Sequence, residues 1–99
     1  MSIRRTVADL VSAGPFPSEE ATVAEIEETQ RLLELITAPV SDEEAKMLLT
    51  AFGPDGCFGL AWTLLHLIET APSALTADYS TNADNEWVKL LEERRRPRQ

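Results

Sequence analysis

The sequence predicts an all-α fold, a compact helical bundle with four principal helices and a short N-terminal helix. Apolar residues recur three or four positions apart along most of the chain, as on one face of a helix. Capping residues, glycines and prolines stand where such helices would begin and end, and no segment alternates apolar and polar residues as a strand would. The 99 residues suffice for one core, so we expect a single helical domain over residues 1–99.

The first helix is expected over residues 2–13, and Gly14–Pro15 would end it. Its apolar face would consist of Ile3, Val7, Leu10 and Val11. The second helix would begin at Ser18 or Thr22, with Thr22 and Glu25 spaced as a capping box, and Pro39 would end it. The residues expected to face the core are Val23, Ile26, Leu33 and Ile36, widened by Leu32 and Leu35.

A second capping box, Ser41 with Glu44, predicts the third helix, which Gly53–Pro54 would end. Asp55 is the expected cap of a fourth helix that is apolar around most of its circumference and therefore central. Asp84 is the expected cap of the last helix, and residues 94–99 are expected to form a frayed basic tail. The expected apolar face of the last helix is Trp87, Val88 and Leu91.

The charge distribution indicates the chemistry of a partner. The net charge is −8, and residues 6–93 contain 17 acidic residues but three basic ones. Such a body repels phosphate backbones, so a nucleic-acid partner is not expected and a basic protein is the natural complement. No apolar run approaches the length needed to span a membrane, and MSIRRTVADL does not read as a secretion signal, so we expect a cytoplasmic location.

Metal and cofactor chemistry is not expected from the residue inventory. Cys57 is the only cysteine and His66 the only histidine, which excludes an intrachain disulfide and the common Cys/His zinc sites. Cys57 itself reads as a small buried residue. His66 and Glu69 are three residues apart and could share a metal or a proton, but a second His and an identifiable nucleophile are missing. The sequence therefore gives no support for an enzyme.

Four polar or small residues form a line on the expected central helix. This polar stripe consists of Gly59, Thr63, His66 and Thr70. It is interpreted either as the strip that neighbouring helices leave uncovered, or as an interface in which Trp62 would be an anchor beside His66. Both Trp62 and Trp87 are, on area alone, more typical of a core.

Acidic residues supply the other candidate contacts, which are Glu25, Glu28, Glu34, Asp42 and Glu43. Acidic residues in the first turn of a helix suit the positive end of its dipole, and the others suit a solvated face. The functional alternative is a negative surface that steers a cationic partner into rapid association. The two interpretations are compatible.

The segments FGLAWTLLHLIETAP and DNEWVKLLEERR resemble small bacterial helical proteins with a Trp-x-x-x-His-x-x-Glu-Thr-Ala-Pro segment. In size, charge and helicity the chain also resembles the immunity proteins of bacterial toxin systems, which implies a non-catalytic inhibitor. The Tyr-Tyr-Pro recognition element of the acidic four-helix immunity proteins is absent, because Tyr79 is the only tyrosine. No family binding residue is therefore carried over.

The leading hypothesis is a protein-binding module, an immunity- or antitoxin-like inhibitor that covers a basic site on a toxin with an acidic helical surface. Its expected contacts are Glu25, Glu28, Glu34, Asp42 and Glu43, with Trp62 and His66 if the polar stripe is exposed. One alternative is a helical adaptor or homo-oligomeric regulatory subunit that associates through Trp87 and the central helix. The other is a small-molecule binder or enzyme with His66 in a pocket lined by Trp62.

Overall fold

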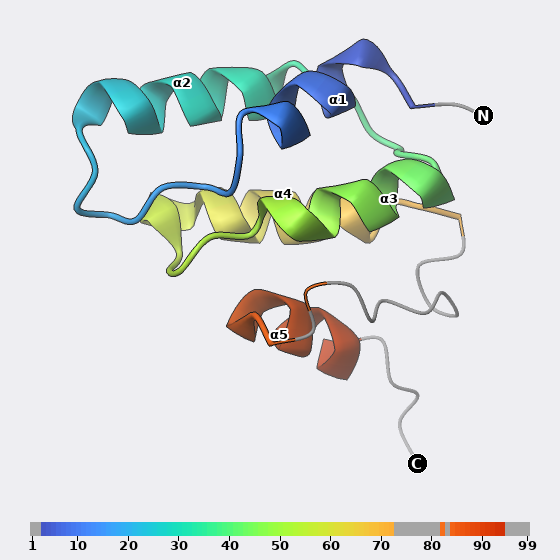
Figure 1. The fold of residues 1–99 in the computed structure, drawn as a ribbon. Helices are drawn as coiled ribbons and strands as arrows, with labels where there is room; N and C mark the ends of the chain where they lie inside the picture. Colours follow the sequence, from blue (N-terminus) through green and yellow to red (C-terminus); the bar gives the residue numbers. More distant parts are fainter. Residues whose placement is uncertain (1–2, 73–81, 83, 95–99) are drawn as a thin grey trace.

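A computed structural model describes residues 3–72, 82 and 84–94, and none of these residues belongs to a strand (Figure 1). The α-helices are α1 (Arg5–Ser12), α2 (Val23–Glu34), α3 (Asp42–Leu48), α4 (Leu60–Ile68) and α5 (Glu86–Arg94), and the 3-10 turns are η1 (Leu49–Ala51) and η2 (Cys57–Gly59). The prediction of an all-α fold is confirmed for the described part of the chain. No helix in this part is long and apolar enough to cross a membrane.

The helices are stacked in layers (Figure 1). Helix α1 packs against α2 and α3, α3 packs against α4, and α4 packs against α5. All five helices contribute to one cluster of buried apolar residues, which includes Val7, Leu10, Leu33, Leu48, Leu64, Leu65, Ile68, Val88 and Leu91. Burial of such side chains is the main favourable contribution to the stability of this arrangement.

Both predicted capping boxes are confirmed. The Thr22 hydroxyl accepts a hydrogen bond from the Glu25 N–H, and the Glu25 carboxylate accepts one from the Thr22 N–H. Ser41 and Glu44 make the same reciprocal pair at the start of α3. Thr22 rather than Ser18 is thus the cap of α2.

Helix α2 is shorter than the sequence predicts, because it ends at Glu34 rather than near Pro39. Two residues expected in its buried stripe are exposed: Val23 retains 70% and Leu35 retains 52% of its accessible surface. The first turn of α2 lies beyond the end of the shorter α1 in Figure 1, and Leu35 follows the last residue of the helix. Both side chains therefore lie outside the packed middle of α2.

The start of α1 also differs from the prediction. The helix begins at Arg5, Ser2 lies outside the described residues, and Ile3 is exposed rather than part of the apolar face. Arg4 precedes the helix in an extended conformation and has no side-chain cap of its own. Its N–H instead donates to the Glu44 carboxylate, 2.8 Å away.

Helix α4 begins at Leu60, so Asp55 is not its cap as predicted. The Asp55 carboxylate accepts hydrogen bonds from the N–H groups of Cys57 and Glu19 and thereby fixes the turn before the helix. Gly59, with φ +93°, occupies the cap position. The apolar side chains that α4 buries are Ala61, Leu64, Leu65, Leu67 and Ile68.

Helix α5 is capped by Asn85 and not by the predicted Asp84. The Asn85 side chain accepts a hydrogen bond from the Trp87 N–H at 2.8 Å and donates to the carbonyl oxygens of Phe52 and Gly53. These bonds tie the start of α5 to the segment after η1. Arg94, assigned above to the frayed tail, ends α5 and pairs with Glu69 at 2.8 Å, whereas residues 95–99 lie outside the described residues.

The α1–α2 connection is held against the end of η1 and the segment that follows it. The Phe16 N–H donates to the Ala51 carbonyl at 2.8 Å, and a Cβ atom on Gly53 would collide with the Phe16 carbonyl group. Only glycine permits this approach of two backbones. The connection leaves the Phe16 ring buried beneath α2.

Candidate protein-binding surface

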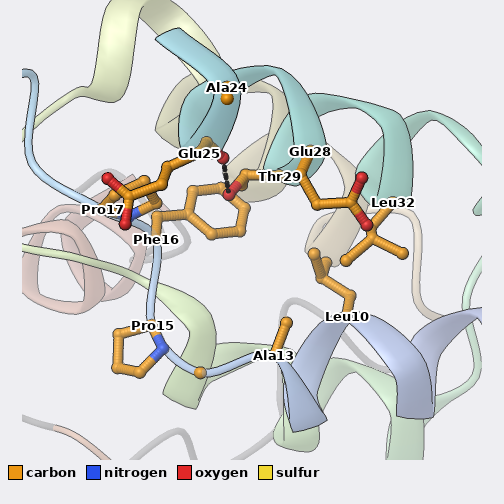
Figure 2. Close-up of a pocket in the computed structure, with 11 residues that line it drawn as sticks. Leu10, Ala13, Pro15, Phe16, Pro17, Ala24, Glu25, Glu28, Thr29 and Leu32 are labelled. Carbon is orange, nitrogen blue, oxygen red and sulfur yellow. Dashed lines mark hydrogen bonds between the residues drawn. The ribbon is translucent and has the colours of Figure 1, made fainter. Parts of the chain in front are cut away.

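A groove of about 400 Å³ separates α2 from the end of α1 and the connection that follows it. We call it the α1/α2 groove. Figure 2 shows the Phe16 ring between α2 and the connection, with Leu10 and Leu32 to one side of it. The α2 side of the groove is formed by Ala24, Glu25, Glu28 and Thr29. An apolar interior thus meets a rim that carries two of the predicted contact residues.

The two rim carboxylates differ in their local partners. The carboxylate of Glu25, an exposed residue, accepts hydrogen bonds from the Thr22 N–H and from the Thr22 hydroxyl, both through Oε1. Glu28 binds Arg31 on the same helix, with oxygen to nitrogen distances of 3.0 and 2.6 Å. The hydrogen bond from Arg31 lowers the pKa of Glu28, so the Glu28 side chain carries its charge throughout the neutral range.

The groove borders the most acidic stretch of the described chain. Residues 19–34 contain six glutamates and one basic residue, Arg31. Within the described residues, Arg31 forms its ion pair with Glu28, and no cation pairs with Glu20 or Glu27. This stretch therefore gives the region of the groove a negative potential that favours a cationic partner.

A second hollow of about 300 Å³ brings together two further predicted residues, Glu34 from α2 and His66 from α4. We call it the His66 hollow; Thr63 and Thr70 also line it, over a floor of Leu33, Ile36 and Leu67. All four members of the polar stripe are exposed, so the stripe faces water. Thr70 also has a structural role, because its hydroxyl accepts a hydrogen bond from the Val40 N–H at 3.0 Å.

The chemistry open to His66 is limited by its neighbours. Its ring lies 6.0 Å from the Trp62 ring, and within the described residues no serine, cysteine or carboxylate forms a hydrogen bond to it. A histidine acts as a general base when a hydrogen-bonded nucleophile is in place. No set of three metal-ligating side chains occurs among the residues that the structure describes.

Asp42 and Glu43 lie in the first turn of α3, where carboxylates suit the positive end of the helix dipole. Neither residue is among those that line the α1/α2 groove or the His66 hollow. The structure therefore does not bring these two predicted contacts together with Glu25, Glu28, Glu34 and His66.

The two tryptophans pack against each other but differ in exposure. The Trp87 ring stacks on Phe52 at a centroid distance of 6.3 Å and meets the Trp62 ring edge-on at 5.1 Å. Trp87 is half-buried against the core, as expected for a side chain with so large an apolar area. Trp62, by contrast, retains 43% of its accessible surface. Trp62 is thus available for an intermolecular contact on the outer side of α4.

Sequence reasoning missed the turn that presents Phe58. Cys57 and Phe58 both have positive φ values, +46° and +53°, followed by Gly59 at +93°. Each non-glycine residue in this region costs roughly 1 kcal/mol. Hydrogen bonds from Cys57 to Asp55 and from Phe58 to Glu19 hold the turn, and Phe58 is 68% exposed. The sequence does contain a signal for this turn, because Gly56 and Gly59 flank Cys57 and Phe58, which the apolar pattern assigned to the fourth helix.

The sequence predicted Glu44 as a partner in a capping box, but it did not predict that the Glu44 carboxylate is buried and paired with Arg4. The Glu44 side chain is 2% exposed and accepts hydrogen bonds from the Arg4 N–H, the Arg4 guanidinium and the Ser41 N–H. Burial opposes ionisation of Glu44, but the bonds from Arg4 and Ser41 outweigh it and lower its pKa to about 2. Glu44 and Arg4 therefore hold α1 and α3 together, and the buried Glu44 carboxylate is not available to a partner.

Comparison with known proteins adds no relative. No protein-family model matches the chain, and no curated protein or solved structure shows significant similarity to it.

Proposed function

We propose that this protein is a non-catalytic binding module, an immunity- or antitoxin-like inhibitor that neutralises a basic toxin through its acidic helical surface. The observation that carries the proposal is the α1/α2 groove, in which an apolar interior is bordered by Glu25 and Glu28. An apolar centre with a charged rim is the usual arrangement of a protein-binding surface.

The two parts of the groove would have different kinetic roles. The carboxylates of residues 19–34 attract a cationic partner from a distance and increase the association rate. The apolar interior, which includes Leu32, loses water when a partner side chain enters and so slows dissociation. The proposal thus predicts charge effects on the on-rate and packing effects on the off-rate.

The first experiment is capture with the tagged protein from its native cell at low and then high salt, with mass spectrometry and light scattering. One stoichiometric basic protein that survives high salt supports the proposal, and its toxic activity is then assayed with and without the inhibitor. Recovery of the tagged protein alone, as a discrete oligomer, favours the homo-oligomeric alternative.

Kinetics with that partner test the division between rim and interior. Glu25→Gln keeps a side chain that can complete the capping box but removes a charge, so it should lower the on-rate and its salt dependence. Leu32→Ala should mainly raise the off-rate. Asp84→Asn makes the same charge change outside the groove and should lower the on-rate less than Glu25→Gln does. Equal effects of both groove variants on both rates would contradict the division.

A second candidate function, small-molecule binding, is favoured by the His66 hollow with its apolar floor and threonine hydroxyls. Recovery of the tagged protein as a lone monomer would direct attention to this hollow. Since His66 is exposed, His66→Ala should leave the fold intact and abolish ligand binding. Unchanged binding by that variant would exclude the second candidate.

A further inference from the structure

A third hollow is formed by α5 and the turn before α4, and it shares no lining residue with the α1/α2 groove. It has a volume of about 440 Å³ and is lined by Asp55, Gly56, Glu86, Trp87, Leu90 and Glu93. We call it the Trp87 hollow. The indole of Trp87 and the side chain of Leu90 make it apolar, while three carboxylates surround these two residues.

Exposed aromatic side chains adjoin this hollow. The Trp87 ring that lines it also meets the exposed Trp62 ring, with 5.1 Å between the centroids. Gly56 lines the hollow with the same indole and precedes the turn that exposes Phe58. Apolar surface therefore extends from the Trp87 hollow to Trp62, with Phe58 exposed on the adjoining turn.

Packing within the fold does not account for an aromatic side chain at position 58. The backbone of Phe58 is in the left-handed region, which glycine or asparagine adopts more readily, and more than two thirds of its side chain faces water. Cys57, by contrast, is fully buried and anchors the turn in the core. An aromatic side chain that is held outward against its backbone preference is suited to contact another molecule.

The charges around this surface select the occupant. Glu19 and Asp55 bind backbone N–H groups of the turn, and neither has an ion-pair partner among the described residues. Glu93 adds a carboxylate, and Glu86 lies 3.7 Å from Lys89 on the exposed side of α5. A second copy of the chain would bring a net charge of −8 against this surface, whereas lysine and arginine side chains would complement it.

We propose that the Trp87 hollow, with Phe58 and Trp62, is a docking site for an amphipathic basic helix of a partner protein. Apolar residues of that helix would enter the hollow and cover the two exposed aromatic rings, and its cations would face Asp55 and Glu93. The inference rests on the proposed function only in that the partner is a basic protein; it adds a second contact surface and the chemistry of the segment that it binds.

The test uses synthetic helical peptides of about 15 residues, a length at which amphipathic helices become stable enough to study. A leucine/lysine peptide should bind the full protein in isothermal titration calorimetry, while leucine/glutamate and serine/lysine peptides of equal length should not. Phe58→Asn should weaken binding of the leucine/lysine peptide by about tenfold or more, as for an aromatic anchor. Glu93→Gln should weaken it less and reduce its salt dependence.

Two controls make the outcome decisive. Leu35→Asn removes another exposed apolar side chain, which is 52% exposed and directly follows α2, and it should leave peptide binding unchanged. The melting temperature of Phe58→Asn should equal or exceed that of the parent protein, because asparagine tolerates the left-handed backbone. A lower melting temperature, or unchanged peptide binding, would overturn the inference, as would equal binding of the serine/lysine peptide.

The same titration separates this inference from the proposed function. Loss of peptide binding in Glu25→Gln together with normal binding in Phe58→Asn would place the peptide in the α1/α2 groove. The proposed function would then stand, and the second docking site would be wrong.

Discussion

Arg4 and Glu44, which are 40 positions apart in the chain, join the beginnings of α1 and α3. The Arg4 backbone N–H and Nε both donate to one carboxylate oxygen of Glu44, at 2.8 and 3.0 Å, and the guanidinium also reaches the other oxygen at 3.2 Å. The same guanidinium donates to Thr37 Oγ1 and to the Pro39 carbonyl. One ion pair thus connects α1, α3 and the α2–α3 connection.

Replacing Glu44 should strongly destabilise the fold. Glu44→Gln keeps the shape of the side chain but removes its charge, so the bonds from Arg4 weaken at a position where the Glu44 side chain is almost fully buried. We expect a loss of about 2 kcal/mol in the free energy of unfolding, measured by urea denaturation. The exposed control Glu27→Gln should change it by less than about 0.5 kcal/mol. Equal stability of the two variants would contradict the structural role of the pair.

The same carboxylate predicts how stability depends on pH. The pKa of Glu44 is about 2 in the folded protein and near its ordinary value of 4.5 when unfolded. The folded state therefore binds fewer protons, and the stabilisation is complete above about pH 4.5 and lost as the pH falls towards 2. The stability difference between the parent and Glu44→Gln should shrink over this interval. A constant difference would show that the charge of Glu44 is not responsible.

Gly53 and Gly14 should respond differently to alanine, although both follow helical segments. A Cβ on Gly53 would collide with the Phe16 carbonyl, whereas no atom lies within 4 Å of a Cβ on Gly14, whose φ is +95°. Gly53→Ala should cost about 2–3 kcal/mol through overpacking, and Gly14→Ala about 1 kcal/mol through backbone strain. Thermal unfolding of both variants measures the difference. The reverse order would mean that the two backbones do not approach as described.

Asn85 rather than Asp84 should carry the stability of α5. Asn85→Ala removes a helix cap and two hydrogen bonds to the carbonyl groups of Phe52 and Gly53, so it should cost about 1–2 kcal/mol. Asp84→Ala, next to it, should change stability by less than about 0.5 kcal/mol. Chemical denaturation of the two variants compares them directly, and a larger loss from Asp84→Ala would restore it as the cap.

What the sequence could predict depended on the distance along the chain over which each interaction acts. The capping boxes of Thr22 with Glu25 and Ser41 with Glu44 span three residues and were predicted with the correct partners. The bonds from Arg4 to Glu44 and from Phe58 to Glu19 span 40 and 39 positions, so no local pattern contains them. The predicted starts of α1 and α4 were wrong for a related reason, because hydrogen bonds with distant parts of the chain hold the residues just before each helix.

The candidate site was predictable in its chemistry but not in its grouping. Charge alone singled out Glu25, Glu28 and Glu34, and helical spacing aligned His66 with Thr63 and Thr70. The structure divides these residues between the α1/α2 groove and the His66 hollow, because Glu34 lies at the opposite end of α2 from Glu25. The depth of each hollow depends on Phe16 and on Leu33, whose burial follows from tertiary packing.

Cys57 makes the Phe58 turn directly observable by thiol chemistry. The thiol is fully buried, and burial, together with the charges of Asp55 and Glu19, raises its pKa, so the chain's single cysteine should react slowly with a thiol reagent. Each labelling event then requires the turn to open, so the labelling rate of Cys57 measures how often the turn opens. A ligand bound at Phe58 should lower this labelling rate, while a ligand bound only in the α1/α2 groove should leave it unchanged.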